Sequence, residues 1–323
     1  MKRVLKGFIA IFMSALLVGP FLVPIPELTD TQPVTKLTYP DSHFAAVNGV
    51  QIHYQSRGTG APAYVLLHGF AASTFSWREV RGPLSVRGQV LAYDRPAFGL
   101  TERPMKWGDW NPYAAAEQVD IALSLMDSLG IDRAIVIGNS AGGNVAAQLA
   151  LRAPERVDAL VLVSPAIGGR SNRFGWLRPM LRLPQLQRIG PLLIRSFGDT
   201  GMELGKLAWH DPNLITPEIE AGYALPLQAQ NWDRALWHFV ASSESDPALS
   251  AQLATLKVPI LVITGDDDRV VPTAQSVVLA NQIGAELVVI TACGHVPQEE
   301  CPQQFIDTLD SFVANRGFAR SPN

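Results

Sequence analysis

The sequence predicts an α/β protein built on a mostly parallel, doubly wound sheet. Short, nearly continuous apolar runs recur along the chain, and such runs are typical of strands that helices cover on both faces. Helical patterns lie between the runs, and this alternation indicates a parallel sheet. The chain has 323 residues, of which 47% are hydrophobic and 17% are charged, so it can bury a large core.

The expected strands begin with a hairpin in which Asn48-Gly49 forms a two-residue turn. Apolar runs then carry the remaining strands, and helical patterns separate them. The strands are expected at 44–47, 50–55, 64–67, 90–93, 134–137, 159–163, 260–264 and 286–290, and the helices at about 113–129, 141–152, 273–283 and 302–315.

The alternation stops between Gly168 and about Leu256, where helical patterns and many prolines occur without a convincing strand. We therefore expect a helical cap at 168–256, inserted into a core formed by 43–167 and 257–317. A cap of this kind would close over one edge of the sheet and shape a substrate pocket.

The N-terminus has the pattern of a targeting segment. Three basic residues within the first six precede an uncharged apolar stretch, so residues 1–26 are expected to be a signal-anchor, with the globular domain membrane-anchored outside the cytoplasm. Pro20 should end the helix near Gly19. The alternatives are a signal peptide, cleaved to release a secreted protein, and a buried core helix. Residues 27–42, which are polar and contain several Pro and Thr, are expected to be a linker.

The composition argues against several classes of partner. With 26 Lys and Arg against 29 Asp and Glu, the chain has a formal charge of −3, so we expect no nucleic-acid partner. Two Cys are too few for a four-thiolate zinc site, and the six His show no metal-binding spacing. No cofactor motif is present. We therefore expect no metal and no cofactor.

The strongest catalytic signal is the segment Gly138-Asn139-Ser140-Ala141-Gly142-Gly143. It follows an apolar run and precedes a helical pattern, which is the strand–turn–helix setting of a nucleophile elbow. The small flanking residues allow a tight turn that exposes the Ser140 hydroxyl at the N-terminal end of the helix. Ser140 is therefore the candidate nucleophile, and the alternative is a glycine-rich turn without chemistry.

A serine nucleophile needs a base and an acid that orients the base. His295 follows the last expected strand, and Asp268 follows the strand before it, so the order along the chain is Ser, Asp, His. Asp266 and Asp267 are adjacent alternatives for the acid, which turn chemistry would also explain. The other candidate histidines are expected on the surface or in the cap, at positions 43, 53, 210 and 238.

The elbow chemistry also needs backbone N–H donors for the developing oxyanion. His68-Gly69-Phe70 follows the third expected strand, the position that supplies one of these donors in such folds. The candidate oxyanion hole is therefore formed by the amides of Phe70 and Ala141.

Together these segments resemble the α/β-hydrolase fold family from about residue 41 to residue 317. The resemblance implies an eight-stranded, mostly parallel sheet with a cap between strands six and seven. It also places the acid three residues after the glycine that ends the seventh strand, which selects Asp268. The resemblance is carried by His68-Gly69-Phe70, by Asp94-Arg95-Pro96-Ala97-Phe98-Gly99, by Gly138 to Gly143, by Gly265 to Asp268 and by Gly294-His295.

The resemblance implies a serine hydrolase, and we expect it to cleave a carboxylic ester through an acyl-enzyme. Simple carboxylesterases and meta-cleavage C–C hydrolases share the pattern, whereas epoxide hydrolases and haloalkane dehalogenases have Asp where Ser140 stands. C–C hydrolases usually carry a Gly-Pro-Gly oxyanion loop and a Trp soon after the catalytic His. Ala71-Ala72-Ser73 follows Phe70 here, and no Trp closely follows His295. C–C hydrolysis and a non-catalytic binding module are the alternatives.

Two further expectations concern the pocket and the cysteines. The only two Cys, Cys293 and Cys301, bracket His295, and we expect a disulfide between them, with two buried free thiols as the alternative. The cap is rich in large side chains, some of which should line the pocket, so a small apolar ester or acyl substrate is expected. These side chains are Phe174, Trp176, Met180, Phe197, Trp209, Tyr223, Trp232, Trp237 and Phe239.

Overall fold

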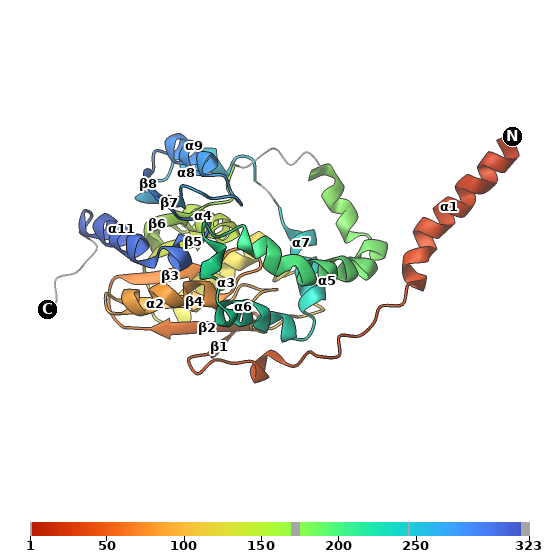
Figure 1. Ribbon diagram of the computed structural model, residues 1–323, viewed down its shortest axis with the longest axis horizontal. Helices are drawn as coiled ribbons and strands as arrows, with labels where there is room; N and C mark the ends of the chain where they lie inside the picture. The colour runs from red at the N-terminus through yellow and green to blue at the C-terminus, as the bar shows by residue number, and fades with distance from the viewer. Residues whose placement is uncertain (1, 169–174, 245, 318–323) are drawn as a thin grey trace.

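The computed structural model describes residues 2–168, 175–244 and 246–317, and Figure 1 shows how their elements are arranged. In this part of the chain eight strands form one open sheet in the order β1-β2-β4-β3-β5-β6-β7-β8. β2 pairs antiparallel with β1 and β4, and all other pairs are parallel, so the predicted fold class is confirmed. The strands are β1 (His43–Val47), β2 (Val50–Arg57), β3 (Ala63–Leu67), β4 (Gln89–Tyr93), β5 (Ala134–Asn139), β6 (Val157–Val163), β7 (Ile260–Gly265) and β8 (Glu286–Ile290).

Helices cover both faces of the sheet. Successive strand residues point to opposite faces, so each strand contributes to two apolar clusters. Val65 and Leu67 of β3 belong to one apolar cluster, with residues of α3 (Ala115–Ser128), α4 (Ala141–Arg152), α8 (Leu249–Leu253) and α9 (Thr273–Ile283). Tyr64 and Leu66 belong to the other, with residues of α2 (Arg78–Ser85) and α11 (Pro302–Ala314). The short α10 spans Pro297–Glu300, and single 3-10 turns span Val34–Lys36 (η1), Thr74–Trp77 (η2) and Pro154–Arg156 (η3).

The sequence did not predict α2. This helix has Gly82 and Pro83 in its interior and buries only Val80 and Leu84, so its apolar pattern is too sparse to detect. The four helices that the sequence did predict are present, with ends that differ by at most two residues.

Between β6 and β7 the chain forms mostly helices, and α5 and α7 lie together to the right of the sheet in Figure 1. They approach closely because α5 has Gly190 at the contact, where an added Cβ would lie 2.1 Å from the ring of Trp237. Trp237 and Trp232 of α7 are buried together with Ile194 of α5. The elements of this segment before α8 are η4 (Gly175–Arg182), α5 (Pro184–Lys206), η5 (Pro212–Leu214), α6 (Pro217–Ala224), η6 (Leu225–Gln228) and α7 (Trp232–Ser242).

The expectation of a transmembrane signal-anchor, with a membrane-anchored catalytic domain outside the cytoplasm, is wrong. Among the helices that the described residues form, none is both long enough and apolar enough to cross a membrane. α1 (Lys2–Leu22) continues through Pro20, where the sequence predicted its end. Its uncharged part, residues 7–22, is still shorter than the roughly 20 apolar residues that a span needs.

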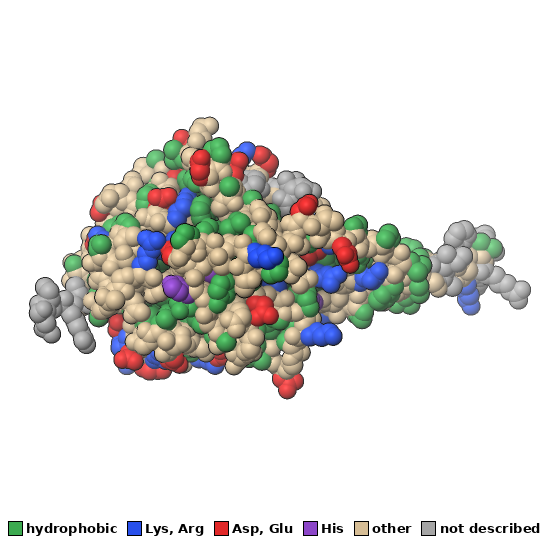
Figure 2. Space-filling model, turned by 90° about the horizontal axis from the view of Figure 1, so that it is seen from below, with side chains coloured by type: hydrophobic (Ala, Val, Ile, Leu, Met, Phe, Trp, Pro, Cys, Tyr) green, Lys and Arg blue, Asp and Glu red, His purple; other side chains and the backbone are tan. Residues whose placement is uncertain are grey.

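The end of α1 and the segment that follows it are held against the cap. Arg188 of α5 donates through Nε to the carbonyl of Pro20 (3.1 Å) and through Nη2 to the carbonyl of Val23 (3.2 Å), and so partners carbonyls near the end of α1. Further along, Gln32 forms a parallel bridge with Ala229. Figure 2 shows α1 as a narrow projection with hydrophobic side chains on its surface. The exposed large hydrophobic residues of α1 include Phe12, Leu16, Leu17, Phe21 and Leu22.

Candidate active site

Ser140 lies in the turn between β5 and α4, where its backbone has a positive φ (φ 51°, ψ −117°). A non-glycine residue rarely adopts a positive φ, and such strain persists only where the surroundings hold it. Here the Ser140 N–H donates to Val163 O (2.8 Å), and Ser140 O accepts from Gly143 N (3.0 Å). The turn thus places the Ser140 side chain at the first turn of α4.

The turn is tight because α4 begins against the end of β3. A Cβ added to Gly142 would lie 2.2 Å from Leu67 O and 2.5 Å from His68 O, a contact that no side chain can make. The glycine at position 142 therefore sets how close the first turn of α4 can come to the loop that begins at His68.

His295 and Asp268 form a buried pair. His295 Nδ1 lies 2.8 Å from Asp268 Oδ2, and the two residues are each 5% exposed. The other carboxylate oxygen of Asp268, Oδ1, accepts the backbone N–H groups of Val270 (2.9 Å) and Val271 (2.8 Å). A carboxylate oxygen can only accept a hydrogen bond, so His295 donates from Nδ1 and its Nε2 lone pair points away from Asp268.

Of the three adjacent acids, Asp268 alone hydrogen-bonds His295 among the contacts of the described residues. Asp266 Oδ1 accepts from the N–H of Cys293 (3.3 Å), which fastens the turn after β7 to the turn after β8. Asp267 is partly exposed and contacts His210 Nδ1 (2.9 Å) and the Arg269 guanidinium. The hydrogen bonds from Arg269 and then His210 lower the pKa of its carboxyl.

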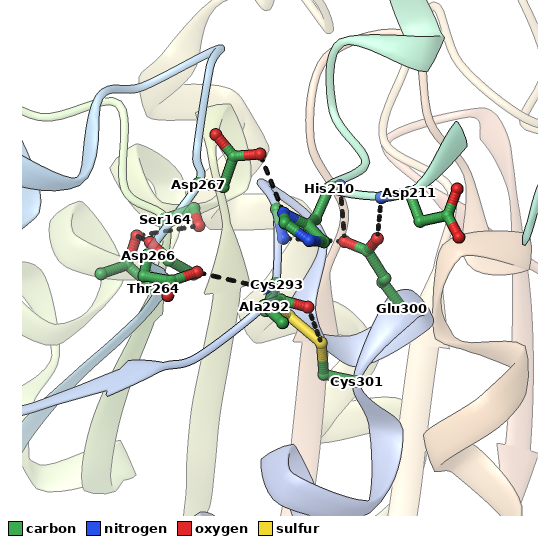
Figure 3. Close-up of a disulfide and its surroundings, with 12 residues drawn as sticks. Ser164, His210, Asp211, Thr264, Asp266, Asp267, Ala292, Cys293, Glu300 and Cys301 are labelled. Carbon is green, nitrogen blue, oxygen red and sulfur yellow. Dashed lines mark hydrogen bonds and ion pairs between the residues drawn. A yellow bond between two sulfur atoms is a disulfide. The ribbon is translucent and has the colours of Figure 1, made fainter. Parts of the chain in front are cut away.

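The loop that carries His295 is fixed at both ends. Cys293 and Cys301 form the predicted disulfide, with Cα atoms 6.3 Å apart, so that prediction is confirmed. Figure 3 shows Glu300 beside it, reaching toward the cap loop of His210 and Asp211. The Glu300 carboxylate accepts the N–H groups of Gly294 (2.7 Å), His210 (3.0 Å) and Asp211 (2.7 Å). No sequence pattern pointed to Glu300, because two of its partners come from a distant segment.

The loop after β3 is oriented by its own hydrogen bonds. His68 Nδ1 donates to Gly69 O (2.8 Å), and His68 Nε2 accepts from the Arg95 N–H (3.0 Å), which defines a neutral ring. Burial, followed by the charge of Arg95, lowers the pKa of His68 to about 3. Arg95 Nη2 also donates to Gly69 O (3.1 Å). Because a trans peptide is planar, two donors on this carbonyl also fix the direction of the Phe70 N–H.

The amides of Phe70 and Ala141 are available to a ligand. In the described part of the chain the Phe70 N–H has no acceptor. The Ala141 N–H belongs to the first turn of α4, which has no acceptor within its own helix. The two loops are adjacent, since a Cβ added to Gly69 would lie 3.3 Å from Ser140 Cβ. Both candidate oxyanion donors therefore lie next to Ser140.

Ser140 and His295 lie on adjacent loops without a direct bond between them. No hydrogen bond joins Ser140 Oγ to the His295 ring among the residues described. The loops are linked one residue away, where Asn139 Nδ2 donates to His295 O (3.2 Å). A catalytic hydrogen bond that is long without substrate commonly tightens when substrate binds.

A cavity of about 370 Å³ opens beside the candidate oxyanion donors, within the range of small-molecule sites. Phe70 and Ala141 line it, whereas Ser140 and His295 lie outside its lining, so it adjoins the pair rather than surrounding it. Of the aromatic cap residues, Phe239 lines the cavity, while Phe174 and the side chains of Trp176 and Phe197 lie outside what the structure describes. The other lining residues are Arg95, Tyr113, Ala115, Gln118, Asn144, Val145, Gln148, Ala166, Leu181, Val240, Ser243 and Glu244.

His53, which was expected on the surface, is buried and bonds Asp94 Oδ2 through Nδ1 (2.7 Å). Asp94 also accepts the N–H groups of Thr74 (2.6 Å) and Leu100 (2.7 Å), so it braces two loops. Burial by itself would raise the pKa of Asp94, but His53 and the hydrogen bond from the Leu100 N–H outweigh burial, and the pKa is about 2.

One group of described residues has spacing suitable for a metal ion. The ligand atoms of Cys293, Glu300 and Cys301 lie within 4.8 Å of one another. The two sulfurs are bonded to each other, and Glu300 is engaged by backbone N–H groups, so this group does not offer thiolate ligands.

Comparison with known proteins shows the family to which this chain belongs. A family model described as alpha/beta hydrolase fold matches residues 62–302. A 2-hydroxymuconate semialdehyde hydrolase of Pseudomonas putida is 31% identical over 277 residues, which cover 82% of this chain and 92% of that protein. The crystal structure of a meta-cleavage product hydrolase from Pseudomonas fluorescens IP01 is 27% identical, with a TM-score of 0.64, and covers 84% of this chain and 97% of that one.

A third similar protein degrades a different class of compound. Est816, described as an N-acyl homoserine lactone degrading enzyme, is 28% identical with a TM-score of 0.65. The match covers 84% of this chain and 100% of that chain. The similar proteins therefore include both meta-cleavage product hydrolases and an enzyme that degrades lactones.

Proposed function

We propose that this chain, which belongs to the α/β-hydrolase fold family and is a hydrolase, cleaves a small carboxylic ester through an acyl-enzyme on Ser140. His295 acts as the base, Asp268 orients it, and the Phe70 and Ala141 amides bind the oxyanion. The carrying observation is the buried 2.8 Å contact of His295 Nδ1 with Asp268, at the sheet edge where Ser140 is held at a positive φ.

The first half of the reaction forms the acyl-enzyme. Ser140 Oγ attacks the ester carbonyl while His295 Nε2 takes the hydroxyl proton, and the negative charge moves to the carbonyl oxygen. Two fixed N–H donors stabilise that charge more than they stabilise the neutral carbonyl, which lowers the barrier. The C–O bond then breaks, and His295 returns the proton to the leaving alcohol.

The second half releases the acid. A water molecule attacks the acyl carbonyl and gives its proton to His295 Nε2, and Ser140 Oγ leaves with that proton. Asp268 stays ionised throughout and stabilises the imidazolium form of His295.

The test is hydrolysis of p-nitrophenyl acetate and butyrate by the full chain and by Ser140→Ala. The variant should lose turnover by several orders of magnitude. Ser164→Ala is the matched control, because Ser164 directly follows the adjacent strand β6, also at a positive φ (45°), but is not assigned to the chemistry. Equal activity of Ser140→Ala and wild type would reject the proposed nucleophile.

C–C bond hydrolysis is the second candidate, and two of the similar proteins favour it. It would use the same residues on a vinylogous diketone, with water adding across a carbon–carbon bond instead of an ester. A ring-cleavage product assay beside the ester assay separates the two. Turnover of a 2-hydroxymuconate semialdehyde at least as fast as of the best ester would replace our proposal with this one.

A further inference from the structure

One buried cation in the cavity has no acidic partner among the described residues. Arg95 is 1% exposed, and its guanidinium donates through Nη1 to Gln118 Oε1 (2.9 Å) and through Nη2 to Gly69 O (3.1 Å). Its Nε–H has no partner in the described part of the chain. Both acceptors are neutral, and no carboxylate among the described residues forms an ion pair with Arg95.

Two partly buried arginines have a buried acid beside them, whereas the other buried arginine, Arg103, forms no ion pair among the described residues, like Arg95. Arg195 contacts the buried Asp233 at 2.8 Å, and Arg78 contacts the buried Glu299. The acid next to Arg95 in the chain, Asp94, is instead engaged by His53 and by backbone N–H groups. A buried charge is costly without a partner. Arg95 lines the cavity and Arg103 does not, so an anion bound in the cavity would supply the acidic partner that Arg95 lacks.

Arg95 is charged at neutral pH and faces the cavity beside the candidate oxyanion donors. Burial lowers its pKa to about 10, which still leaves the guanidinium protonated. It lines the cavity together with Phe70 and Ala141. The acid that also lines the cavity, Glu244, is exposed and contacts Arg182 (3.4 Å), so it does not neutralise Arg95.

We propose that Arg95 forms an anion-binding subsite in this cavity and that the natural substrate is a small ester carrying a carboxylate. Two of the five N–H groups of Arg95 are used by the protein, and the other three have no acceptor among the described residues. A planar carboxylate matches this group, since it can accept two parallel N–H bonds. The substrate is then an apolar ester with one acidic end. This inference rests on the proposed ester hydrolysis.

The experiment compares substrates that differ only in charge. On the alcohol side the pair is 4-(acetoxymethyl)benzoate and 4-(acetoxymethyl)benzamide, and on the acyl side it is monophenyl terephthalate and phenyl 4-carbamoylbenzoate. In at least one pair the wild-type kcat/KM should be about tenfold or more higher for the acid than for the amide. A factor of this size corresponds to the free energy of one hydrogen bond to a charged group. Arg95→Gln should remove most of that preference, a reduction of about tenfold or more.

Arg103→Gln is the matched control. Arg103 is also buried and donates to the carbonyls of Thr101 and Gly99, but it does not line the cavity. Its loss should leave the acid-to-amide ratio unchanged. If Arg95→Gln slows both members of each pair equally, Arg95 only positions Gly69, and the subsite is refuted.

A second measurement does not depend on the variant folding. Benzoate should inhibit wild-type hydrolysis of the neutral benzamide ester at concentrations about tenfold or more below those of benzamide. Equal inhibition, or no preference for the acid in either pair, overturns the subsite while ester hydrolysis stands. If no ester is cleaved, the proposed function fails, and calorimetric binding of benzoate over benzamide by wild type then decides the subsite separately.

Discussion

Replacing Asp268 by Asn should nearly abolish turnover, because the geometry around Asp268 determines how an amide would sit. The Oδ1 position accepts two backbone N–H groups, from Val270 and Val271, so the amide oxygen of the introduced Asn must occupy it. The amide NH₂ then faces His295 Nδ1, where a carboxylate oxygen now lies at 2.8 Å. Two donors cannot face each other, so the imidazole proton moves to Nε2.

In that tautomer Nε2 has no lone pair to direct toward the nucleophile, and His295 can no longer accept the Ser140 proton. We therefore expect kcat for p-nitrophenyl acetate to fall by about 10,000-fold, the size seen when a triad imidazole is held in the wrong tautomer. Folding should be retained, because the backbone hydrogen bonds to the Oδ1 position remain.

Initial rates over a range of substrate concentrations, with thermal unfolding as the folding check, provide the assay. Asp266→Asn and Asp267→Asn are matched controls, since the hydrogen bonds of these two acids go to groups other than His295. If Asp268→Asn loses less than about tenfold while Asp266→Asn is crippled, the tautomer argument and the choice of acid are both refuted.

Three further results should follow. Gly142→Ala, whose Cβ would lie 2.2 Å from Leu67 O, should lower the urea unfolding free energy by about 1–3 kcal/mol, whereas Gly143→Ala, with a nearest contact of 3.3 Å, should cost less; equal losses would contradict the close-approach argument. Folding lowers the pKa of Asp94 from 3.8 to about 2, so ionised Asp94 contributes about 2 kcal/mol to the unfolding free energy well above pH 3.8, and this contribution is lost as the pH falls through the folded pKa. In acid unfolding curves, Asp94→Asn should therefore make the unfolding free energy less dependent on pH. Glu300→Gln, which puts an NH₂ against backbone N–H donors, should lower the unfolding free energy by about 2 kcal/mol and also slow ester turnover, and an unchanged rate would show that the His295 loop does not need this contact.

Each part of the site that the sequence predicted follows from a local residue pattern and from the order of the strands. The elbow around Ser140 needs only adjacent residues between a strand and a helix. Asp268 and His295 each follow a strand, and the carboxyl ends of neighbouring parallel strands meet at one edge of the sheet. Their contact could therefore be expected without coordinates.

Features that the sequence did not predict depend on contacts between distant segments. Glu300 is engaged by the loop at His210, 90 residues away in the chain. His53 is buried because Asp94, which directly follows a neighbouring strand, faces it. The lack of an acid beside Arg95 is also invisible in the sequence, where Asp94 precedes it. The N-terminal helix runs past its predicted end, which was placed near Gly19 because proline usually breaks a helix, whereas Pro20 lies inside α1.

The central claim is that Ser140 is a nucleophile activated by His295, and covalent labelling tests it most directly. The full chain is treated with a fluorophosphonate, digested and analysed by mass spectrometry. We predict one adduct on Ser140 in wild type, none in Ser140→Ala and a strongly slowed adduct in His295→Ala. An unlabelled wild type, or an adduct that persists in Ser140→Ala, would contradict the account.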